Sequence, residues 1–354
     1  MMIRSNILRA RSVIQNMCLS HTHKLAYVVE GMDWSIKQDG LAIVRALNAK
    51  NLLRARLTYS PIGLRNNIIH FGSVNTFFKK NGWHKPHKTN KIVITWFHVV
   101  PNDPKLSLMK EAQQDIDLIH TSCASTKKIL VEAGVLEEKI IVIPLGVDPH
   151  LFLPVTNISR TAMRRKLGIS SDRLVIGSFQ KDGVGWGEGL TPKLIKGPDV
   201  FVEVVSALKN FDPLVLLTGP ARGYVKRELE KRGIEYKHIY LKNFVDLPLM
   251  YHALNLYCIT SRIEGGPKAV LESWASGIPV ISTRVGMVPD IAISEQNILL
   301  GDVDNIESLT YLAERLVRDQ VLSERLVQNG YKEVTKYTWN KIASRYYELM
   351  YKGL

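Results

Sequence analysis

The chain has 354 residues, of which 45% are hydrophobic and 23% charged, an ordinary composition for a globular protein. This length exceeds the size at which one hydrophobic core usually stops growing, so two domains are expected. No apolar run approaches the ~18 residues of a membrane-spanning helix. The basic N-terminal segment has no sustained apolar core either, so a cleaved signal peptide is not expected.

Net positive charge is concentrated in the first third of the chain. Residues 1–110 carry 17 Lys and Arg against 4 Asp and Glu, and the remainder carries 30 against 29. This asymmetry favours an anionic partner, for which a phospholipid surface, a lipid-diphosphate acceptor and nucleic acid are candidates. A merely solubilising surface is the alternative. Nucleic acid is the least favoured partner, because this part has no stacking-aromatic or recognition-helix pattern.

The three cysteines indicate neither a disulfide framework nor a zinc site. Cys18, Cys123 and Cys258 are odd in number, far apart and without metal-ligand spacing. A reducing cytoplasm therefore fits best. Cys123 and Cys258 fall in expected strands and are interpreted as small core residues.

Strands and helices alternate along the first half. The pattern predicts strands at 24–29, 67–71, 91–97, 118–121 and 140–143, and helices at 39–47, 105–115 and 126–133. Ser125 is expected to cap the last of these helices and Gly134 to end it. The Pro- and Gly-containing stretch 144–154 is the expected linker.

The second half repeats this alternation after the linker. Strands are expected at 174–179, 213–218, 239–241, 256–260, 279–283 and 297–300, and helices at 159–167, 199–208, 224–232, 247–253, 267–276, 306–318 and 338–351. The order predicts an α/β fold of two doubly wound, Rossmann-like domains, at 1–152 and 153–335, followed by a C-terminal helix at 336–354. Ligands of such sheets bind at the carboxyl ends of the strands, so an active site in an interdomain cleft is expected.

The densest chemical signal is the segment 261–280, SRIEGGPKAVLESWASGIPV. It predicts a strand end, a turn at Gly265 and Gly266, and a helix with Pro267 at its first position. The two glycines allow backbone N–H groups to approach a ligand, and the positive end of the helix dipole lies beside them. Such a corner suits a diphosphate. Lys268 and Glu272, four residues apart, are expected on one face of the helix.

The spacing within this segment resembles a known family. Seven residues separate Glu264 from Glu272, and Gly277, Pro279 and Val280 follow. This pattern is similar to that of the retaining, metal-independent glycosyltransferases of the GT-B fold, the glycosyl transferases group 1 family. The resemblance implies that Glu264 contacts the donor sugar near the reacting carbon and that Glu272 binds the nucleotide ribose. Two solvated carboxylates flanking a helix are the alternative.

The resemblance covers the chain well from about residue 90 to the end. Phe244 and Val245 stand where the family places backbone contacts to the base, and the 338–351 segment resembles the terminal helix that crosses back to the first domain. His98, after the strand at 91–97, is by resemblance a contact to the donor sugar that orients the acceptor. A core histidine is the alternative for His98, and for His70 the structural interpretation is favoured.

The cations that balance the leaving diphosphate match the family only in part. Lys196, followed by Gly197, supplies one of them, but the usual Arg after Gly177 is missing. Lys181, Lys193 and Arg262 are the candidates to replace it. The inserted glycine-rich segment 183–189 is interpreted as a mobile lid or as a disordered insertion.

Asp115 and Asp117 form a DxD pair, the metal motif of a different transferase fold. Their place at a helix-to-strand junction favours capping or solvation instead, because a divalent ion needs convergent oxygens. Neither a metal nor a cofactor is expected, and the nucleoside-diphosphate sugar is a co-substrate.

The resemblance implies a hexosyltransferase that moves a hexose from a nucleotide sugar to an acceptor hydroxyl with retained configuration. The acceptor is unknown, and a lipid-linked one is a candidate. Synthesis of a cell-surface polysaccharide or glycolipid, in the cytoplasm or at the inner face of the membrane, is expected. An epimerase-like enzyme of the same fold and a catalytically weakened nucleotide-sugar-binding protein remain alternatives, and the missing Arg supports the second.

Overall fold

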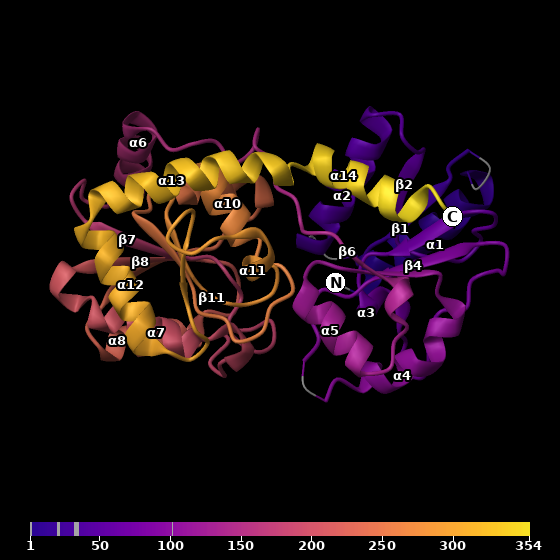
Figure 1. Ribbon diagram of the computed structural model, residues 1–354, viewed down its shortest axis with the longest axis horizontal. Coiled ribbons are helices and arrows are strands. Elements are labelled where there is room, and N and C mark those ends of the chain that lie inside the picture. The colour runs from indigo at the N-terminus through magenta and orange to yellow at the C-terminus, as the bar shows by residue number, and fades with distance from the viewer. Residues whose placement is uncertain (1, 20–21, 32–34, 101) are drawn as a thin grey trace. The chain divides into compact units, whose positions relative to one another are not determined.

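The computed structural model describes residues 2–19, 22–31, 35–100 and 102–354 (Figure 1). They divide into two compact units. Unit 1 comprises Met1–Gly146 together with Thr338–Leu354, and unit 2 comprises Val147–Tyr337. No helix among the described residues combines the length and the apolar character that crossing a bilayer requires.

Unit 1 is built on a parallel sheet of six strands in the order β2-β1-β3-β4-β5-β6. The strands are β1 (Leu25–Val28), β2 (Ala55–Thr58), β3 (Ile68–Phe71), β4 (Lys91–Thr95), β5 (Leu118–Thr121) and β6 (Ile140–Val142). The helices are α1 (Met2–Leu19), α2 (Ser35–Ala49), α3 (Val74–Phe77), α4 (Pro104–Ala112), α5 (Ala124–Glu132) and α14 (Trp339–Tyr346). The inner strands are apolar and buried, as expected when helices cover both faces of a parallel sheet.

The sequence pattern predicts neither β2 nor α1 of unit 1, nor the short helix α3, which has only four residues. Strand β2 (ARLT) alternates apolar and polar residues over only four positions, too short a run to be recognised. Helix α1 buries Ser12 and Asn16, so its inner face is polar and lacks the usual apolar stripe.

The C-terminal segment belongs to unit 1 and packs on α2. There Gly146 lies against the Trp339 ring, because a Cβ at this glycine would be 2.6 Å from two ring carbons. The segment continues beyond α14 as a π-helix, Tyr347–Tyr351. The predicted helix that returns to the first domain is therefore confirmed.

A buried polar network joins this segment to the sheet. His70 bonds to the Tyr351 hydroxyl at 2.6 Å and to the Thr95 hydroxyl at 2.7 Å. His120 bonds to the same Thr95 hydroxyl at 3.0 Å and to the Tyr346 hydroxyl at 3.0 Å. Burial lowers the pKa values of both histidines, that of His120 to about 4. Both rings are therefore neutral near pH 7, and His70 has the structural role favoured from the sequence.

Unit 2 contains a second parallel six-stranded sheet, in the order β12-β11-β10-β7-β8-β9. Its strands are β7 (Leu174–Ser178), β8 (Pro213–Thr218), β9 (Glu235–Ile239), β10 (Leu256–Ile259), β11 (Val280–Thr283) and β12 (Leu299–Gly301). Its helices are α6 (Asn157–Leu167), α7 (Pro198–Ala207), α8 (Gly223–Lys231), α9 (Leu247–Tyr251), α10 (Ala269–Ser276), α11 (Val288–Ile291), α12 (Ile306–Arg318) and α13 (Gln320–Val334). The core is formed by the central strands with α7, α8, α12 and α13.

Several local predictions need correction. Ser125 does not cap α5: the N-cap is Cys123, and the Ser125 hydroxyl donates to the Cys123 sulfur. Cys123 consequently follows its strand, although it is buried as predicted. The strand expected at 239–241 lies at Glu235–Ile239, where it pairs with β8 as a half-buried edge strand. Its sequence, EYKHI, is polar and contains no apolar run that would predict a strand.

Candidate functional site

The candidate site lies at the carboxyl ends of the unit 2 strands, where parallel sheets bind their ligands. The loop after β7 carries Lys181, Lys193 and Lys196, and the loop after β10 carries Arg262 and Glu264. Strands β7 and β10 are hydrogen-bonded neighbours, so these loops emerge side by side. Backbone N–H groups of Arg262 and of the next residue both donate to the Ile195 carbonyl, which holds the loops together.

The glycine corner is tied to the connection after β11. The Met287 N–H donates to the Gly265 carbonyl at 2.8 Å, and a Cβ at Gly286 would lie 2.3 Å from the same oxygen. Helix α10 begins at Ala269, so Pro267 precedes the helix and does not occupy its first position as predicted. The end of α10 is as expected, with Gly277 in the left-handed conformation.

Glu264 is held in place by two donors. Its Oε1 lies 2.6 Å from the Lys196 ammonium and 2.9 Å from the Ser261 hydroxyl. The side chains of Glu264 and Lys196 are only 9% and 17% exposed. A charge-assisted hydrogen bond of this kind fixes both groups in one orientation, and Glu264 is not a solvated carboxylate.

Two further lysines surround this pair. The pKa of Lys193 is lowered, first by burial and then by the positive charges of Lys196 and Lys181, while Glu264 opposes the shift. Burial also lowers the pKa of Lys181, whose ammonium lies 4.1 Å from the Trp186 ring centroid. Glu264 is thus bonded to one ammonium group and interacts electrostatically with a second, Lys193, which Lys181 also influences. This excess of positive charge suits a polyanion such as a diphosphate.

Arg262 is engaged by carboxylates of its own unit. Its guanidinium forms two hydrogen bonds with Asp199, at 2.8 and 2.7 Å, and an ion pair with Asp304 at 2.7 Å. Hydrogen bonding to Asp199 raises the pKa of Arg262. Two partner charges already balance this cation, so Lys193 and Lys181 are the better placed candidates to replace the missing Arg.

Arg222, which the sequence did not single out, anchors the inserted loop. This residue is 1% exposed and ion-pairs with Asp182 at 3.0 Å. Its guanidinium also donates to the carbonyl and the hydroxyl of Ser178, the residue after Gly177 where the family usually has Arg. A guanidinium from the neighbouring strand end is therefore placed beside that position, although it is too buried to meet a ligand.

The inserted segment itself packs closely on this anchor. Positions 183 and 189 accept no side chain, because a Cβ at either glycine would lie within 2.4 Å of the Ala221 carbonyl oxygen. Val184 donates to the Thr191 carbonyl, which closes the segment into a small hairpin. The loop is also bonded to the start of α8, because the N–H groups of Gly223 and Tyr224 donate to the carbonyls of Glu188 and Gly189.

Glu272 faces the other side of the corner. It is 6% exposed, and its Oε2 accepts a hydrogen bond of 2.8 Å from the Tyr251 hydroxyl. The Lys268 ammonium lies 5.5 Å from the Phe244 ring centroid, and the neighbouring Val245 is exposed. The structure thus places the predicted ribose and base contacts on α9, α10 and the turn before α9.

Three predicted or excluded residues lie in unit 1. His98 follows β4, is half-buried, and its carbonyl accepts from the Trp96 indole at 3.0 Å. Asp115 accepts from the Trp83 indole, and Asp117 accepts from the Ile92 N–H. The two aspartates therefore have structural partners. Within the described parts of the chain, no group of His, Cys, Asp and Glu is arranged to hold a metal.

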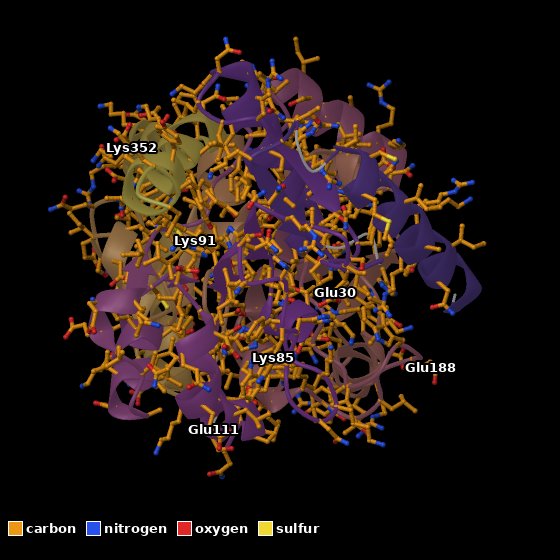
Figure 2. The ribbon with its side chains drawn as sticks, turned by 90° about the vertical axis from the view of Figure 1, so that its right-hand side faces the viewer. Glu30, Lys85, Lys91, Glu111, Glu188 and Lys352 are labelled. Atoms are coloured by element: carbon orange, nitrogen blue, oxygen red, sulfur yellow. The ribbon has the colours of Figure 1, made fainter. Side chains whose placement is uncertain are left out.

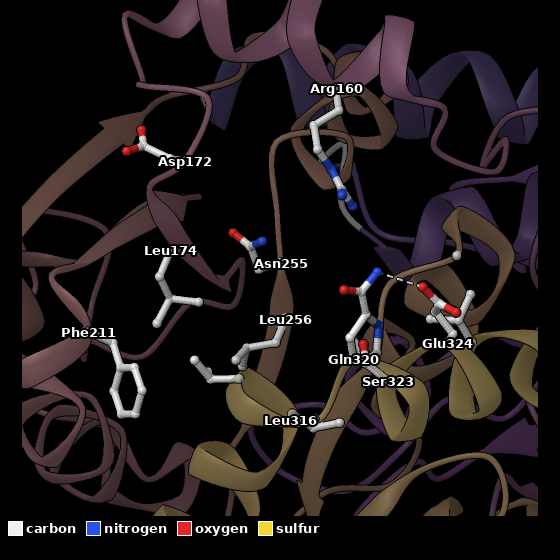
Figure 3. Close-up of a pocket in the computed structure, with 14 residues that line it drawn as sticks. Arg160, Asp172, Leu174, Phe211, Asn255, Leu256, Leu316, Gln320, Ser323 and Glu324 are labelled. Carbon is white, nitrogen blue, oxygen red and sulfur yellow. Dashed lines mark hydrogen bonds between the residues drawn. The ribbon is translucent and has the colours of Figure 1, made fainter.

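A separate cavity of about 570 Å³ lies at the opposite ends of the unit 2 strands, their amino ends (Figure 3). Leu174 and Leu256, the first residues of β7 and β10, line it together with Arg160 and Asn255. Figure 3 also shows Gln320 bonded to Glu324 at its rim. Because the cavity is at the amino ends of the strands, it is distinct from the candidate site.

Comparison with known proteins identifies the part of the chain that carries this site. Residues 190–333 match the model of the family described as glycosyl transferases group 1. The chain is 26% identical over 244 residues to the D-inositol 3-phosphate glycosyltransferase of Stackebrandtia nassauensis, covering 64% of this chain and 52% of the relative. It is 25% identical over 215 residues to the lipopolysaccharide core biosynthesis mannosyltransferase LpsB of Rhizobium meliloti, covering 58% of each. The chain thus spans about half the length of the curated relatives it matches.

Solved structures share the fold of nearly the whole chain. The Anabaena Alr3699/HepE protein in complex with UDP-glucose has a TM-score of 0.75 at 14% identity, over 94% of this chain and all of that one. A glycosyltransferase from Rickettsia africae has a TM-score of 0.71 at 16% identity, over 92% and 97%. Together with the two parallel six-stranded sheets, these matches confirm the predicted fold class.

Proposed function

We propose that the chain, whose residues 190–333 match the model of the glycosyl transferases group 1 family, transfers a hexose from a nucleoside-diphosphate sugar to an acceptor hydroxyl, with retention and without a metal. The observation that carries the proposal is the Lys196–Glu264 pair, set at a glycine corner among two further lysines. Such a group supplies fixed positive charge where a diphosphate departs, together with a carboxylate beside the sugar.

In this proposal the residues of unit 2 hold the donor. Lys196 and Lys193 balance the diphosphate, assisted by the backbone of Gly265 and Gly266. Glu264 lies at the sugar and Glu272 at the ribose. The acceptor attacks from the face that the phosphate leaves, and the departing phosphate oxygen takes its proton. His98 of unit 1 contacts the sugar and orients the acceptor.

The base would lie against the segment of Phe244 and Val245. Lys268, which lies over the Phe244 ring, would hold this segment beside α10. Lys181 would sit at the outer side of the diphosphate, over Trp186. Arg262 would act through the loop that it fixes to Asp199.

The relatives support a hexose donor and an acceptor at the cell surface. One of them is a mannosyltransferase of lipopolysaccharide core biosynthesis, and a structural neighbour was solved with UDP-glucose. We therefore propose a role in polysaccharide or glycolipid synthesis at the cytoplasmic face of a membrane. A lipid-linked acceptor would bring the basic part of the chain, residues 1–110, to an anionic surface.

The test is the substitution Lys196→Ala, assayed with candidate UDP-, GDP- and ADP-sugars. Removing one charge-stabilising donor typically lowers the rate ~10²–10³-fold. We expect this loss in a protein that still folds, with an unfolding midpoint lowered because Glu264 loses its charge partner. Lys166→Ala, at an exposed position of α6 in the same unit, is the control and should retain full activity. Near-normal turnover by Lys196→Ala would remove this residue from the mechanism.

Chelation separates the proposed scheme from a metal-dependent one. Transfer should persist in excess EDTA, and a strict requirement for added Mg²⁺ or Mn²⁺ would contradict it.

A catalytically weakened binding protein is the second candidate. It is favoured by Ser178, which stands where the family usually has Arg. Donor binding without transfer or slow hydrolysis would support this candidate, and a changed sugar in the absence of acceptor would instead indicate an epimerase.

A further inference from the structure

Helix α1 of unit 1 buries polar side chains and exposes apolar ones, the reverse of an ordinary surface helix. Its buried side chains are polar, namely Ser12 and Asn16, which are 3% and 0% exposed. Large apolar side chains face outward instead: Ile7, Ile14 and Met17 are 49%, 65% and 63% exposed. A helix on a folded domain usually does the opposite, because burying apolar surface is what stabilises its packing.

The inward face is fixed by specific hydrogen bonds. The Asn16 amide donates to the carbonyls of Ser60 and Ile62 at 2.8 and 2.7 Å, and its oxygen accepts from the Arg56 guanidinium at 2.6 Å. The Ser12 hydroxyl accepts from the Tyr59 N–H at 3.1 Å. Rotating the helix to bury its apolar residues would leave these buried groups unpaired, so the outward orientation is imposed by the rest of unit 1.

The outward residues form one continuous stripe. Ile7 and Ile14 are seven residues apart and Met17 follows three later, so all three share a face of the helix. The turn that contains Ile62, itself 59% exposed, adjoins Met17, because a Cβ at the next residue, Gly63, would lie 3.2 Å from the Met17 Cγ. In Figure 2 the helix, drawn in indigo, runs along the periphery of unit 1 with side chains projecting outward.

The charge around this stripe identifies its partner. Helix α1 contains three arginines and no acidic residue, and residues 1–110 carry 17 basic against 4 acidic residues. Arg11 follows Ile7 by four residues and therefore adjoins the stripe. An apolar stripe on a basic helix is the pattern of a helix that lies in the plane of an anionic bilayer, its apolar face among the acyl chains. A stable protein interface needs ~20–30 residues a side, many more than this stripe offers.

We propose that α1 is an interfacial membrane anchor that docks unit 1 on an anionic phospholipid bilayer through Ile7, Ile14 and Met17. Helix α1 would then be the element of unit 1 that meets the anionic membrane surface. The anchor does not depend on the proposed transfer reaction, because an anchor needs neither donor nor acceptor.

The test is co-sedimentation of the full chain with vesicles. Vesicles of equal parts phosphatidylcholine and phosphatidylglycerol should bind the protein, more weakly at high salt, and phosphatidylcholine alone should bind it poorly. The triple variant Ile7→Gln, Ile14→Gln and Met17→Gln keeps good helix formers in α1. We expect it to bind the anionic vesicles at least about tenfold more weakly.

The matched control changes equally exposed apolar residues of unit 2, Ile158→Gln, Val321→Gln and Ile293→Gln, and should bind like the parent. The α1 variant should also keep the parent's stability and its activity on a water-soluble acceptor, which separates this proposal from the transferase proposal. Undiminished vesicle binding by the α1 variant would overturn the anchor. So would a parent dimer that ignores vesicles and that the same variant converts to monomer.

Discussion

At the scale of single residues, the candidate donor site depends on bonds that orient its carboxylates. Glu264 is held by Lys196 and Ser261, and Glu272 by Tyr251. Each acid is nearly buried, so its charge must be balanced or bonded to remain inside the fold. Of these hydrogen bonds, the one from the Tyr251 hydroxyl to Glu272 can be removed with the least change in side-chain shape.

We predict that Tyr251→Phe destabilises the protein by about 1–3 kcal/mol, because the buried Glu272 carboxylate loses a donor. Denaturant unfolding monitored by fluorescence measures this difference. The same variant should bind the donor nucleotide more weakly, because Glu272 loses a bond that orients it toward the proposed ribose position. Tyr240→Phe, at a 69% exposed position, is the control. Equal stability of the two variants would show that the Tyr251 bond contributes nothing.

At the scale of elements, the site requires two loops to turn sharply at the ends of neighbouring strands. Gly197 follows Lys196 in the left-handed conformation, with φ at 59°, and begins α7. A Cβ at Gly197 would lie 1.9 Å from the Thr260 carbonyl oxygen at the end of β10. Glycine is thus required after Lys196 because the backbones of two connections meet there.

We predict that Gly197→Ala lowers the free energy of unfolding by about 2–4 kcal/mol, from left-handed strain together with overpacking. It should also lower activity, because Lys196 moves with the turn. Gly187→Ala is the matched control in the same connection, since a Cβ there meets no atom within 4 Å. Thermal unfolding of both variants decides the point, and a Gly197→Ala protein as stable as the control would contradict it.

At the scale of the whole molecule, the two units should respond differently to acid. Unit 1 buries His70 and His120 as neutral rings, and burial depresses both pKa values. In the unfolded chain each histidine titrates near its ordinary pKa of about 6.5. Their contribution to stability is therefore complete above that pH and is lost as the pH falls toward the depressed values.

For His120, with a folded pKa of about 4, the loss between neutral pH and pH 4 amounts to about 3 kcal/mol. Hydrogen exchange on peptides from each unit, compared at pH 7 and pH 4.5 after correction for the intrinsic rate, should show unit 1 opening first. His120→Gln should flatten this dependence, while His150→Gln, at an exposed position, should not. Earlier opening of unit 2 would refute the prediction.

The sequence by itself determined the alternation of strands and helices, the parallel sheets and the segment that carries Glu264 and Glu272. These are local properties, since a buried strand is a continuous apolar run and the glycine corner is formed by residues adjacent in the sequence. The two main misses have different origins, one local and one long-range. Strand β9 is too polar to be recognised, and α1 turns polar residues inward because its partners, at 56–62, are distant in sequence.

Only the tertiary structure decided which cations gather around Glu264. The sequence does not distinguish Lys181, Lys193 and Arg262 as candidate cations. In the structure two carboxylates form ion pairs with Arg262, whereas Lys193 interacts with Lys196 and Lys181. Arg222, adjacent to no recognisable motif, reaches Ser178 from the connection that follows the neighbouring strand, β8. Coulombic and hydrogen-bonding partners are chosen by distance in space, and that distance is set only when the strands have paired.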